Sequence, residues 1–535
     1  MGNKKRGKKS TAANDDRANT RRHATVTTPV DDNTTLVPAA VLSRILDYTS
    51  QATVLNVAAV CKSWRGVAQA HELYYAHVSL DGDGCSSVVE HSEKSKQFFV
   101  SIFDAVHDAH FKRLHVFLSS PTPDEVDDFE DGDDEVDEIM INNLTAVKMI
   151  EIQMRYIVHL DMSLPYTYKA LLEMFLRTKP APVLEELYFC FDGEPEAGPG
   201  PFASLPPDLF HGSAPALKSV TLTGVELTAK PVRAFANVRR VLLQQYSSEA
   251  LLFVLHNFPG MTHLTLDFLA ADFDNRYIGL DEPVPPQAVK SLGARLQHLE
   301  LNLYASEMGL PTQLRTILEK QAIPSIAVSL CAEEPEEDDS EIAAAYDFAP
   351  FLAHVGKPYR VVLRRERQYS GPTAEDWERR PHDAEASLVM EIFSLGSHFK
   401  RRFTLLQRLP ELAPHIRELE VADVLLRELF RELDSMSLPR LKRLTIDFDL
   451  PQRDEANAWE DFARRGSGKI ECPNLESVTL RCVMAYRPSV NDQDVAAVLA
   501  RFKPGSKLPE LCCAGVTLST GDDSSLLSSI VEMHI

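Results

Sequence analysis

The stretch Arg465-Gly466-Ser467-Gly468-Lys469-Ile470 comes closer to a known ligand-binding motif than any other part of the sequence. Glycines followed by a lysine can hold nucleotide phosphates through backbone N–H groups and the lysine ammonium. That motif also requires an earlier glycine and a magnesium-binding Ser or Thr, and Ala463 and Ile470 stand at those positions. We therefore expect a flexible turn here and no nucleotide site.

The cysteines and histidines show no spacing typical of a metal or catalytic site. Cys472, Cys482, Cys512 and Cys513 form the densest cysteine group, yet no C-x-x-C pair with a matching second pair exists. No H-E-x-x-H occurs among the histidines, and no G-x-S-x-G marks a serine nucleophile. A triad assembled from distant positions would leave no such motif. The prediction is a protein without catalytic residues, metal or cofactor.

A helical pattern between Val37 and Tyr74 is the feature around which the chain is organised. Leu42, Ile45 and Leu46 have the i, i+3, i+4 spacing of one helical face, and Pro38 suits a first helical turn. A second apolar run repeats at three and four residues through Val54, Leu55, Val57, Val60, Cys61 and Trp64. Two or three short helices are expected to fold as a hairpin. Because so short a segment buries little apolar surface by itself, part of that surface must face a partner.

Residues 37–74 resemble an F-box, the adaptor-binding module of SCF-type ubiquitin ligases. The Val60-Cys61-x-x-Trp64 close is the most diagnostic part. The resemblance implies that the adaptor-binding residues are Pro38, Val41, Leu42, Ile45, Leu46, Leu55, Val60, Cys61 and Trp64. Val37, Ala40, Thr49 and Tyr74 depart from the usual F-box pattern. The alternative is a helical hairpin that packs only against its own domain.

Two acidic runs carry much of the net charge of −22. Eleven of the fifteen residues in Asp124–Glu138 are acidic, as are seven of the nine in Glu333–Glu341. Because like charges repel, we expect solvated loops there, with docking of basic partners as the alternative. Residues 1–33 are polar and predominantly basic, which predicts a disordered tail. The remaining surface is acidic, which disfavours a nucleic-acid partner.

The sequence also bears on compartment. No apolar run approaches the roughly 20 residues that a membrane span needs, and MGNKKRGKKS lacks the apolar core of a secretory signal. The cysteines form no disulfide framework. We expect an intracellular protein, cytoplasmic and/or nuclear, without a membrane partner.

After the helical segment, a phrase with apolar residues at its first, fourth and sixth positions recurs. Its last two apolar residues alternate with a polar one, which is typical of a strand, and helical patterns lie between the copies. Such helices are predicted around Leu171–Leu176, Leu251–Phe258, Leu425–Leu433 and Val495–Phe502. The phrase occurs as FKRLHV from Phe111, VKMIEI from Val147, LEELYF from Leu184, LKSVTL from Leu217, VRRVLL from Val238, MTHLTL from Met261, LQHLEL from Leu296, IRELEV from Ile416, LKRLTI from Leu441 and LESVTL from Leu475.

This series is similar to the strands of leucine-rich repeats, which often follow an F-box. The predicted fold class is α/β: an N-terminal all-α F-box helical hairpin, then an irregular leucine-rich-repeat-like solenoid with a curved parallel sheet and helices on its convex side. One or two conventional α/β domains are the alternative. Between residues 335 and 415 the phrase fades and basic residues appear, which we interpret as an insertion and a candidate for specificity. From Lys503 onward we expect a capping repeat with Val516 and Leu518 in its strand.

The predicted domains are a disordered basic tail at 1–33, an F-box-like domain at 34–80 and a substrate-binding array at 81–535, with acidic loops at 123–138 and 333–341. The F-box resemblance implies a substrate receptor that a Skp-type adaptor links to cullin and RING subunits of a ubiquitin ligase. The substrate is unknown, and its candidate contacts on the strands are Lys218, Thr221, His263, Thr265, His298, Glu300, Lys442 and Thr445. The rival hypotheses are a repeat scaffold outside a ligase and an α/β enzyme without a recognisable motif.

Overall fold

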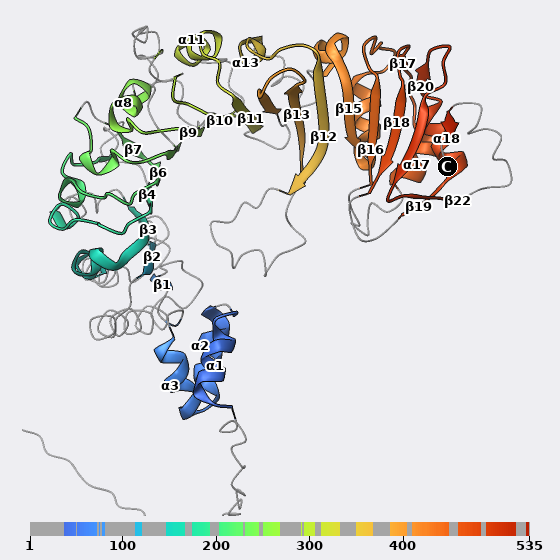
Figure 1. Ribbon diagram of the computed structural model, residues 1–535. Helices are drawn as coiled ribbons and strands as arrows, with labels where there is room; N and C mark the ends of the chain where they lie inside the picture. Colours follow the sequence, from blue (N-terminus) through green and yellow to red (C-terminus); the bar gives the residue numbers. More distant parts are fainter. Residues whose placement is uncertain are drawn as a thin grey trace, which may run out of the picture. The chain divides into compact units, whose positions relative to one another are not determined.

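A computed structural model shows the helices and strands of the protein (Figure 1). The chain divides into two compact units, Met1–Ala76 and His77–Ile535. The structure describes residues 37–49, 51–71, 74, 77–80, 113–119, 146–165, 174–192, 203–227, 230–244, 250–267, 290, 294–304, 312–331, 349–367, 386–403, 409–448, 458–482, 488–519 and 531–533. The predicted tail at 1–33 and the predicted acidic loops at 123–138 and 333–341 lie outside these residues.

Short helices make up the described part of the N-terminal unit: α1 (Ala39–Leu46), α2 (Gln51–Val60) and α3 (Lys62–Ala70). Pro38 is the N-cap of α1, and its carbonyl accepts hydrogen bonds from the N–H groups of Val41 and Leu42 at 2.9 and 3.0 Å. α3 packs against both α1 and α2. The core of this unit consists of Leu46, Val54, Ala58 and Ala68. The helices predicted from the apolar spacing are therefore present.

A single large sheet runs through the described part of the second unit, and it has 17 strands. The strands are β1 (His77–Leu80), β2 (Leu114–Ser119), β3 (Ile157–Pro165), β4 (Glu186–Asp192), β6 (Ser219–Thr223), β8 (Arg240–Gln244), β9 (His263–Asp267), β10 (His298–Tyr304), β11 (Ser325–Cys331), β12 (Tyr359–Arg367), β13 (Ala386–Ser394), β14 (Lys400–Phe403), β15 (Ile416–Ala422), β16 (Arg443–Asp447), β18 (Ser477–Arg481), β21 (Glu510–Ala514) and β23 (Glu532–Met533).

Neighbouring strands in this sheet mostly follow one another in the chain. The order runs from β1 through β2, β3, β4, β6, β8, β9 and β10 to β11. It continues through β14, β13 and β12 to β15, β16, β18, β21 and β23. Within the described strands, only the pairs that β13 makes with β12 and β14 are antiparallel. A parallel pair needs a crossover between its strands, so segments of the chain must return along a face of the sheet between successive parallel strands.

The recurring phrase marks strands because its apolar residues stack in register. Leu187, Val220, Val241 and Leu264 are neighbours across β4, β6, β8 and β9, and all four are buried. Backbone hydrogen bonds join the turns ahead of the strands in the same way: the N–H of Arg239 donates to the carbonyl of Lys218 at 2.8 Å. Nine of the ten predicted copies of the phrase end in one of these strands.

The prediction that the phrase from Val147 leads into a strand was wrong. Residues 146–153 are helical, and a 3-10 turn at Met154–Tyr156 leads into β3. The strand uses Ile157, Leu160 and Met162, which have the same spacing and are buried. Val158 fills a position that is polar in the other copies, which obscured the match. A second copy, Ile323, Ile326 and Val328, leads into β11 and was also missed.

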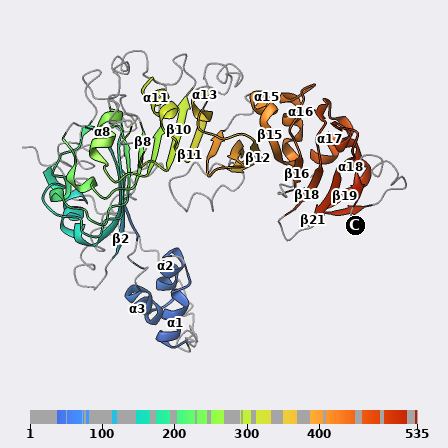
Figure 2. The same cartoon turned by 45° about the horizontal axis from the view of Figure 1, so that its top comes forward.

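Helices cover one face of this sheet (Figure 2). They are α8 (Ala250–Asn257), α11 (Thr312–Lys320), α13 (Ala349–Leu352), α15 (Leu409–Leu412), α16 (Leu426–Glu432), α17 (Ala458–Arg465) and α18 (Asp492–Leu499). An aromatic contact joins the helices to the sheet: Phe351 of α13 meets Phe403 of β14 edge to face at 6.1 Å. Within the covering layer, Phe258 after α8 stacks at 5.1 Å on Phe235 of the 3-10 turn Arg233–Phe235. Three of the predicted helices are confirmed as α8, α16 and α18, while Leu171 and Leu172 of the fourth lie outside the described residues.

Residues 335–415 contribute three strands to the large sheet, so their interpretation as an insertion from the array was wrong. After β11, the chain forms β12 three strand positions away in the sheet. It then returns through β13 and β14, which fill the two positions between β12 and β11. The phrase fades here because β13 runs antiparallel to β12 and β14, and antiparallel pairs do not require a crossover.

The C-terminal end also differs from the prediction. β21 and β23 continue the large sheet, whereas β22 (Thr517–Ser519), which contains Leu518, pairs with β19 (Ser489–Asn491) in a separate sheet. Two further small sheets pair β5 (Ala203–Ser204) with β7 (Val225–Glu226) and β17 (Ile470–Cys472) with β20 (Phe502–Pro504). None of the helices described here is long and apolar enough to span a bilayer.

Candidate protein-interaction sites

The face of the large sheet opposite the helices carries the polar half of each strand; we call it the polar face. Along β9 the buried Leu264 and Leu266 alternate with the partly exposed His263 and Thr265. Six of the eight candidate contact residues lie on this face at partly exposed positions: Thr221, His263, Thr265, His298, Glu300 and Thr445. Thr265 donates to Glu300 at 3.2 Å, and the rings of His263 and His298 are 5.8 Å apart. Register thus brings His263 and Thr265 of β9 beside His298 and Glu300 of β10. Thr221 lies two strands away on β6, and Thr445 lies on β16, beyond β11 to β15.

Lys218 and Lys442 lie elsewhere, in the turns ahead of β6 and β16. Lys218 pairs with Glu185 at 2.8 Å and Lys442 with Glu476 at 2.5 Å. Each pair joins one turn to a neighbouring turn. Both lysines are exposed or half-exposed, so these ion pairs contribute little to stability.

Side chains on the polar face form hydrogen-bonded ladders across strands. Thr223 donates to Gln244 at 2.8 Å, and Gln244 donates to Asp267 at 2.9 Å. Burial raises the pKa of Asp161 on β3 to about 6, although the charge of His159 acts in the opposite direction. Burial also raises the pKa of Asp267, while its hydrogen bonds with Gln244 and Asn302 lower it. These partly buried carboxyls make the β3–β10 section sensitive to mildly acidic pH.

An ionic network crosses the polar face from β12 to β18. Glu420 accepts from Arg360 at 2.8 Å and from Arg481 at 2.6 Å, and Arg481 also pairs with Asp447 at 2.5 Å. Burial alone would raise the pKa of Glu420, but the bonds from the two arginines outweigh it and lower that pKa. Glu420 is therefore held ionised at neutral pH.

The features first considered for ligand chemistry have structural roles. Arg465–Ile470 is the turn between α17 and β17, where Gly468 has a φ of 92° that favours glycine and the N–H of Lys469 donates to Asp434 at 3.1 Å. Cys472 and Cys482 are buried cysteines. Across the described residues, no group of three or more His, Cys, Asp or Glu side chains could hold a metal ion.

Helix α1 of the N-terminal unit has two apolar faces. Leu42 and Leu46 point into the unit and are 3% and 1% exposed, whereas Val41 and Ile45 are 49% and 51% exposed. Pro38 is exposed as well. An apolar stripe that faces solvent beside the buried face of a helix is typical of a protein-binding surface.

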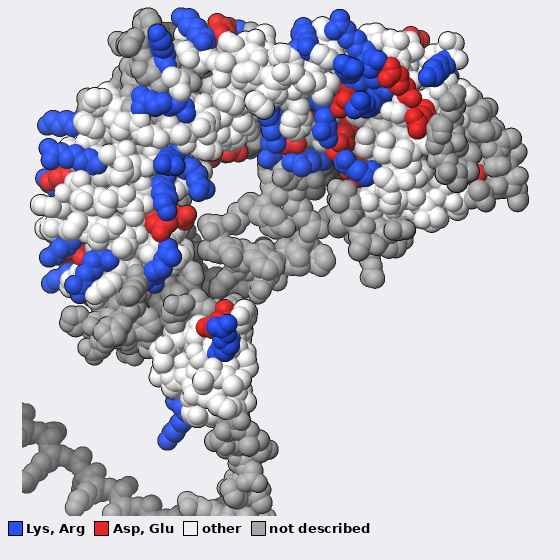
Figure 3. Space-filling model, viewed as in Figure 1, with Lys and Arg blue, Asp and Glu red and all other residues white. Residues whose placement is uncertain are grey.

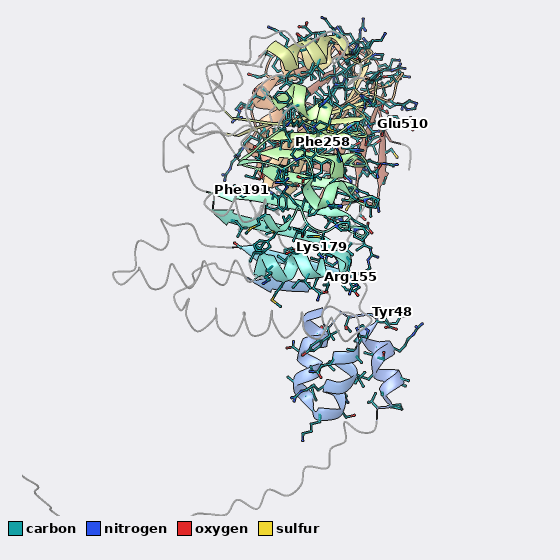
Figure 4. All side chains as sticks on the ribbon, turned by 90° about the vertical axis from the view of Figure 1, so that its left-hand side faces the viewer. Tyr48, Arg155, Lys179, Phe191, Phe258 and Glu510 are labelled. Atoms are coloured by element: carbon teal, nitrogen blue, oxygen red, sulfur yellow. The ribbon has the colours of Figure 1, made fainter. Side chains whose placement is uncertain are left out.

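Tyr48 extends this stripe just beyond the end of α1. It is 79% exposed, and Figure 4 shows its side chain pointing away from the helices. The guanidinium of Arg44 lies 5.8 Å from its ring centroid. Positions 41, 45 and 48 have helical spacing, so these three apolar side chains share one side. The sequence pattern did not single out Tyr48, because it interrupts the apolar run of the hairpin; its large exposed ring is the signal.

The segment from Val60 to Trp64 forms the junction between α2 and α3. Val60 is 53% exposed. Cys61 has extended backbone angles and caps α3, with its sulfur accepting from the N–H of Trp64 at 3.5 Å. Arg65 donates through Nε to the carbonyl of Ala58 at 2.9 Å, which satisfies one carbonyl near the end of α2. The Val-Cys-x-x-Trp spacing is thus a helix–helix junction, with Cys61 as its cap.

His71 ties the end of this unit to its beginning. Its side chain is 4% exposed, and its Nε2 lies 3.2 Å from the carboxylate of Asp47, which follows α1. Of the nine predicted adaptor-binding residues, Pro38, Val41, Ile45 and Val60 are exposed, Cys61 and Trp64 are half-buried, and Leu42 and Leu46 are core residues. The side chain of Leu55 lies outside the described residues.

Residues 35–79 match the F-box-like family model. The F-box-like segment therefore covers all three described helices of the N-terminal unit. An F-box is a protein-interaction module that generally binds a Skp-type adaptor, which fits the exposed apolar stripe of α1. The search of curated proteins found no match for the chain.

Proposed function

We propose that this protein is the substrate-receptor subunit of an SCF-type ubiquitin ligase. The F-box-like segment binds a Skp-type adaptor, and through it cullin and RING subunits. The second unit, a leucine-rich-repeat-like solenoid in this proposal, recruits a protein substrate. Such a complex acts within the cell, in the cytoplasm or the nucleus.

One observation carries the adaptor-binding part of this proposal: α1 exposes Val41 and Ile45 within the segment that matches the F-box-like model. Because each side chain is already about half-buried, covering its exposed half by a partner contributes about 1 kcal/mol. The buried Leu42 and Leu46 support the surface from behind by fixing the helix.

The large sheet supports the substrate-binding part. The described helices lie on one face of the mostly parallel sheet, and none of them covers the polar face (Figure 1). Repeat proteins use such extended surfaces to bind other proteins. The receptor itself is non-catalytic in this proposal. Its contribution is to hold a substrate lysine at high effective concentration near a ubiquitin thioester carried by another subunit.

The test is co-purification of a Skp-type adaptor and cullin with the intact chain and with a Val41→Asp, Ile45→Asp variant. Both positions are half-exposed, so the variant keeps its core, and circular dichroism checks its fold. Ile152→Asp is the matched control, because Ile152 is 58% exposed in the second unit. We expect the intact chain and the control to retain the adaptor and the variant to lose it.

Two other outcomes would reject the proposal. If the intact chain retains neither adaptor nor cullin, the chain is better explained as a repeat scaffold outside a ligase. If the adaptor is retained but no co-purifying protein carries polyubiquitin, the segment binds the adaptor without building a ligase.

A further inference from the structure

Four cationic side chains gather on one section of the polar face, on β12 and β14. This cationic patch consists of Arg360, Arg364, Lys400 and Arg402. Glu391 on β13, between these strands, is the only carboxylate on the same face among the side chains that the structure describes on the three strands. Position 366, a glutamate near the end of β12, has the same strand alternation. Four positive charges against two negative leave a surplus of two on these strands, on a chain whose net charge is −22. Figure 3 shows Lys and Arg side chains at the level of β12 and β13.

Phe393 on β13 fixes two of these cations. The guanidinium carbon of Arg360 lies 5.7 Å from its ring centroid, and Nζ of Lys400 lies 5.4 Å from it. Register places the three residues in one row, so the ring has a cation on each neighbouring strand. Cation–π contacts of this kind hold the positive groups in defined positions.

Glu391 lies beneath the patch and its side chain is only 4% exposed. It pairs with Arg364 at 3.1 Å and with Lys400 at 2.5 Å, while the side chains of these two cations are 46% and 38% exposed. The carboxylate orients the cations from below. Their charged groups remain available to a second anion from solvent.

Carboxylates bound the patch on both sides. Glu300 on β10 and Glu418 on β15 lie five strand spacings apart, which corresponds to about 24 Å. An extended peptide of about seven residues spans that distance. The phosphate backbone of a longer nucleic acid would meet these carboxylates at either end, so the width and charge of the patch favour a short acidic protein segment.

We propose that the cationic patch binds an acidic segment of a partner protein, in which several Asp or Glu carboxylates fall within about seven residues. The inference names the class of segment that the proposed receptor recruits and rests on that function for its biological role. Its binding test contains no adaptor, so the two proposals can fail separately.

The experiment measures fluorescence anisotropy of a labelled ten-residue Asp/Glu-rich peptide titrated with the intact chain. The same peptide with Asn and Gln in place of Asp and Glu is the ligand control. We expect the acidic peptide alone to bind, and more weakly as salt rises. Absence of binding, or equal binding of the neutral peptide, would overturn the proposal.

A charge-removing variant locates the site. Arg364→Gln with Arg402→Gln should weaken binding about tenfold, while Arg364→Lys with Arg402→Lys should retain most of it. The matched control is Arg239→Gln with Arg240→Gln, which changes the net charge equally at exposed positions ahead of and on β8. An equal loss in that control would show a diffuse charge effect and overturn the assignment.

Glu391→Gln gives the opposite sign, which a folding defect cannot imitate. It removes the one carboxylate beneath the patch while keeping a side chain that can accept hydrogen bonds from Arg364 and Lys400. We expect binding to strengthen about threefold. Unchanged or weaker binding in a variant whose circular dichroism matches the intact chain would overturn the proposal.

The same assay tests two other possible ligands of the cationic patch, a nucleic acid and the chain's own acidic run. A single-stranded oligonucleotide of equal charge that binds more tightly, and loses affinity in the Arg364→Gln, Arg402→Gln variant, would replace the protein segment. If peptide binding requires replacing the acidic residues of Glu333–Glu341 by Asn and Gln, the chain's own acidic run is the occupant and the partner proposal is overturned.

Discussion

Arg360 on β12 donates a 2.8 Å hydrogen bond to Glu420 on β15, 60 positions later in the chain. Between them the chain forms β13 and β14, which run back to β11. Glu420 also accepts from Arg481 on β18, so one carboxylate joins strands from both sides of β16. The contact thereby links β12, the last of the three strands whose order in the sheet is reversed, to β15 and the strands that follow.

We therefore expect Glu420→Gln to destabilise the second unit by about 1–2 kcal/mol at pH 7. The side chain of Glu420 is 14% exposed, so the loss exceeds that of a surface pair. The pKa of Glu420 is lowered in the fold, so its stabilisation is present above the ordinary value of 4.5 and is lost as pH falls through the folded pKa. Urea unfolding at pH 7 and at lower pH should show the gap between variant and wild type narrowing on acidification. Glu471→Gln, at a pair whose side chains are 50% and 60% exposed, is the control with little change.

The two faces of α1 predict opposite effects for neighbouring residues. Leu46→Ala removes a core side chain that is 1% exposed and should cost about 2–5 kcal/mol, unfolding the F-box-like segment. Ile45→Ala, at a side chain that is 51% exposed, should change stability by less than about 0.5 kcal/mol and still weaken adaptor capture. Hydrogen exchange of the helix and adaptor pull-down separate the two effects. Equal protection in both variants would contradict the assignment of faces.

The sequence predicted the strands well wherever the chain repeats the phrase with apolar residues at its first, fourth and sixth positions. Leu264 and Leu299, for example, lie in copies of one phrase and become neighbours in register, because a parallel array places equivalent residues side by side. It failed at Val147, whose apolar spacing fits a helix as well as a strand entry. A short apolar pattern does not distinguish a helix from a strand. The chain joins the sheet only later, where Leu160 is the register partner of Val116 on β2 and Leu187 on β4.

The region around β12 to β14 was beyond sequence reasoning for a different reason. Its strand order reverses, and the contacts of Phe393 with Arg360 and Lys400 depend on pairings across two strands. Nothing in the local sequence specifies that β12 lies beside β15. Sequence also could not divide the predicted adaptor-binding residues into core and surface, because Leu42 and Ile45 both fit one amphipathic spacing.

Cys61 is expected to contribute through its cap and not through thiol chemistry. Its sulfur accepts from the N–H of Trp64 at the start of α3, a position where Ser is preferred. Cys61→Ala should destabilise α3 by about 0.5–1 kcal/mol, and Cys61→Ser should preserve or improve it. Hydrogen exchange over Lys62–Ala70 measures the difference. Equal exchange in the Ala and Ser variants would rule out the capping role.

Because the pKa of Asp161 is raised, we expect the second unit to lose stability as pH rises. Burial raises the pKa of this carboxyl from 3.8 to about 6, so between these values the folded state keeps a proton that the unfolded state releases. The fold therefore loses stability relative to an Asp161→Asn variant as pH rises through this range, and the loss reaches about 3 kcal/mol at pH 7. Asp208→Asn gives a control of opposite sign, because the hydrogen bond from Arg177 lowers the pKa of Asp208. Urea unfolding of both variants across this range should show the two gaps moving in opposite directions. A gap for Asp161→Asn that does not change with pH would mean that this carboxyl ionises on β3 as readily as it does in water.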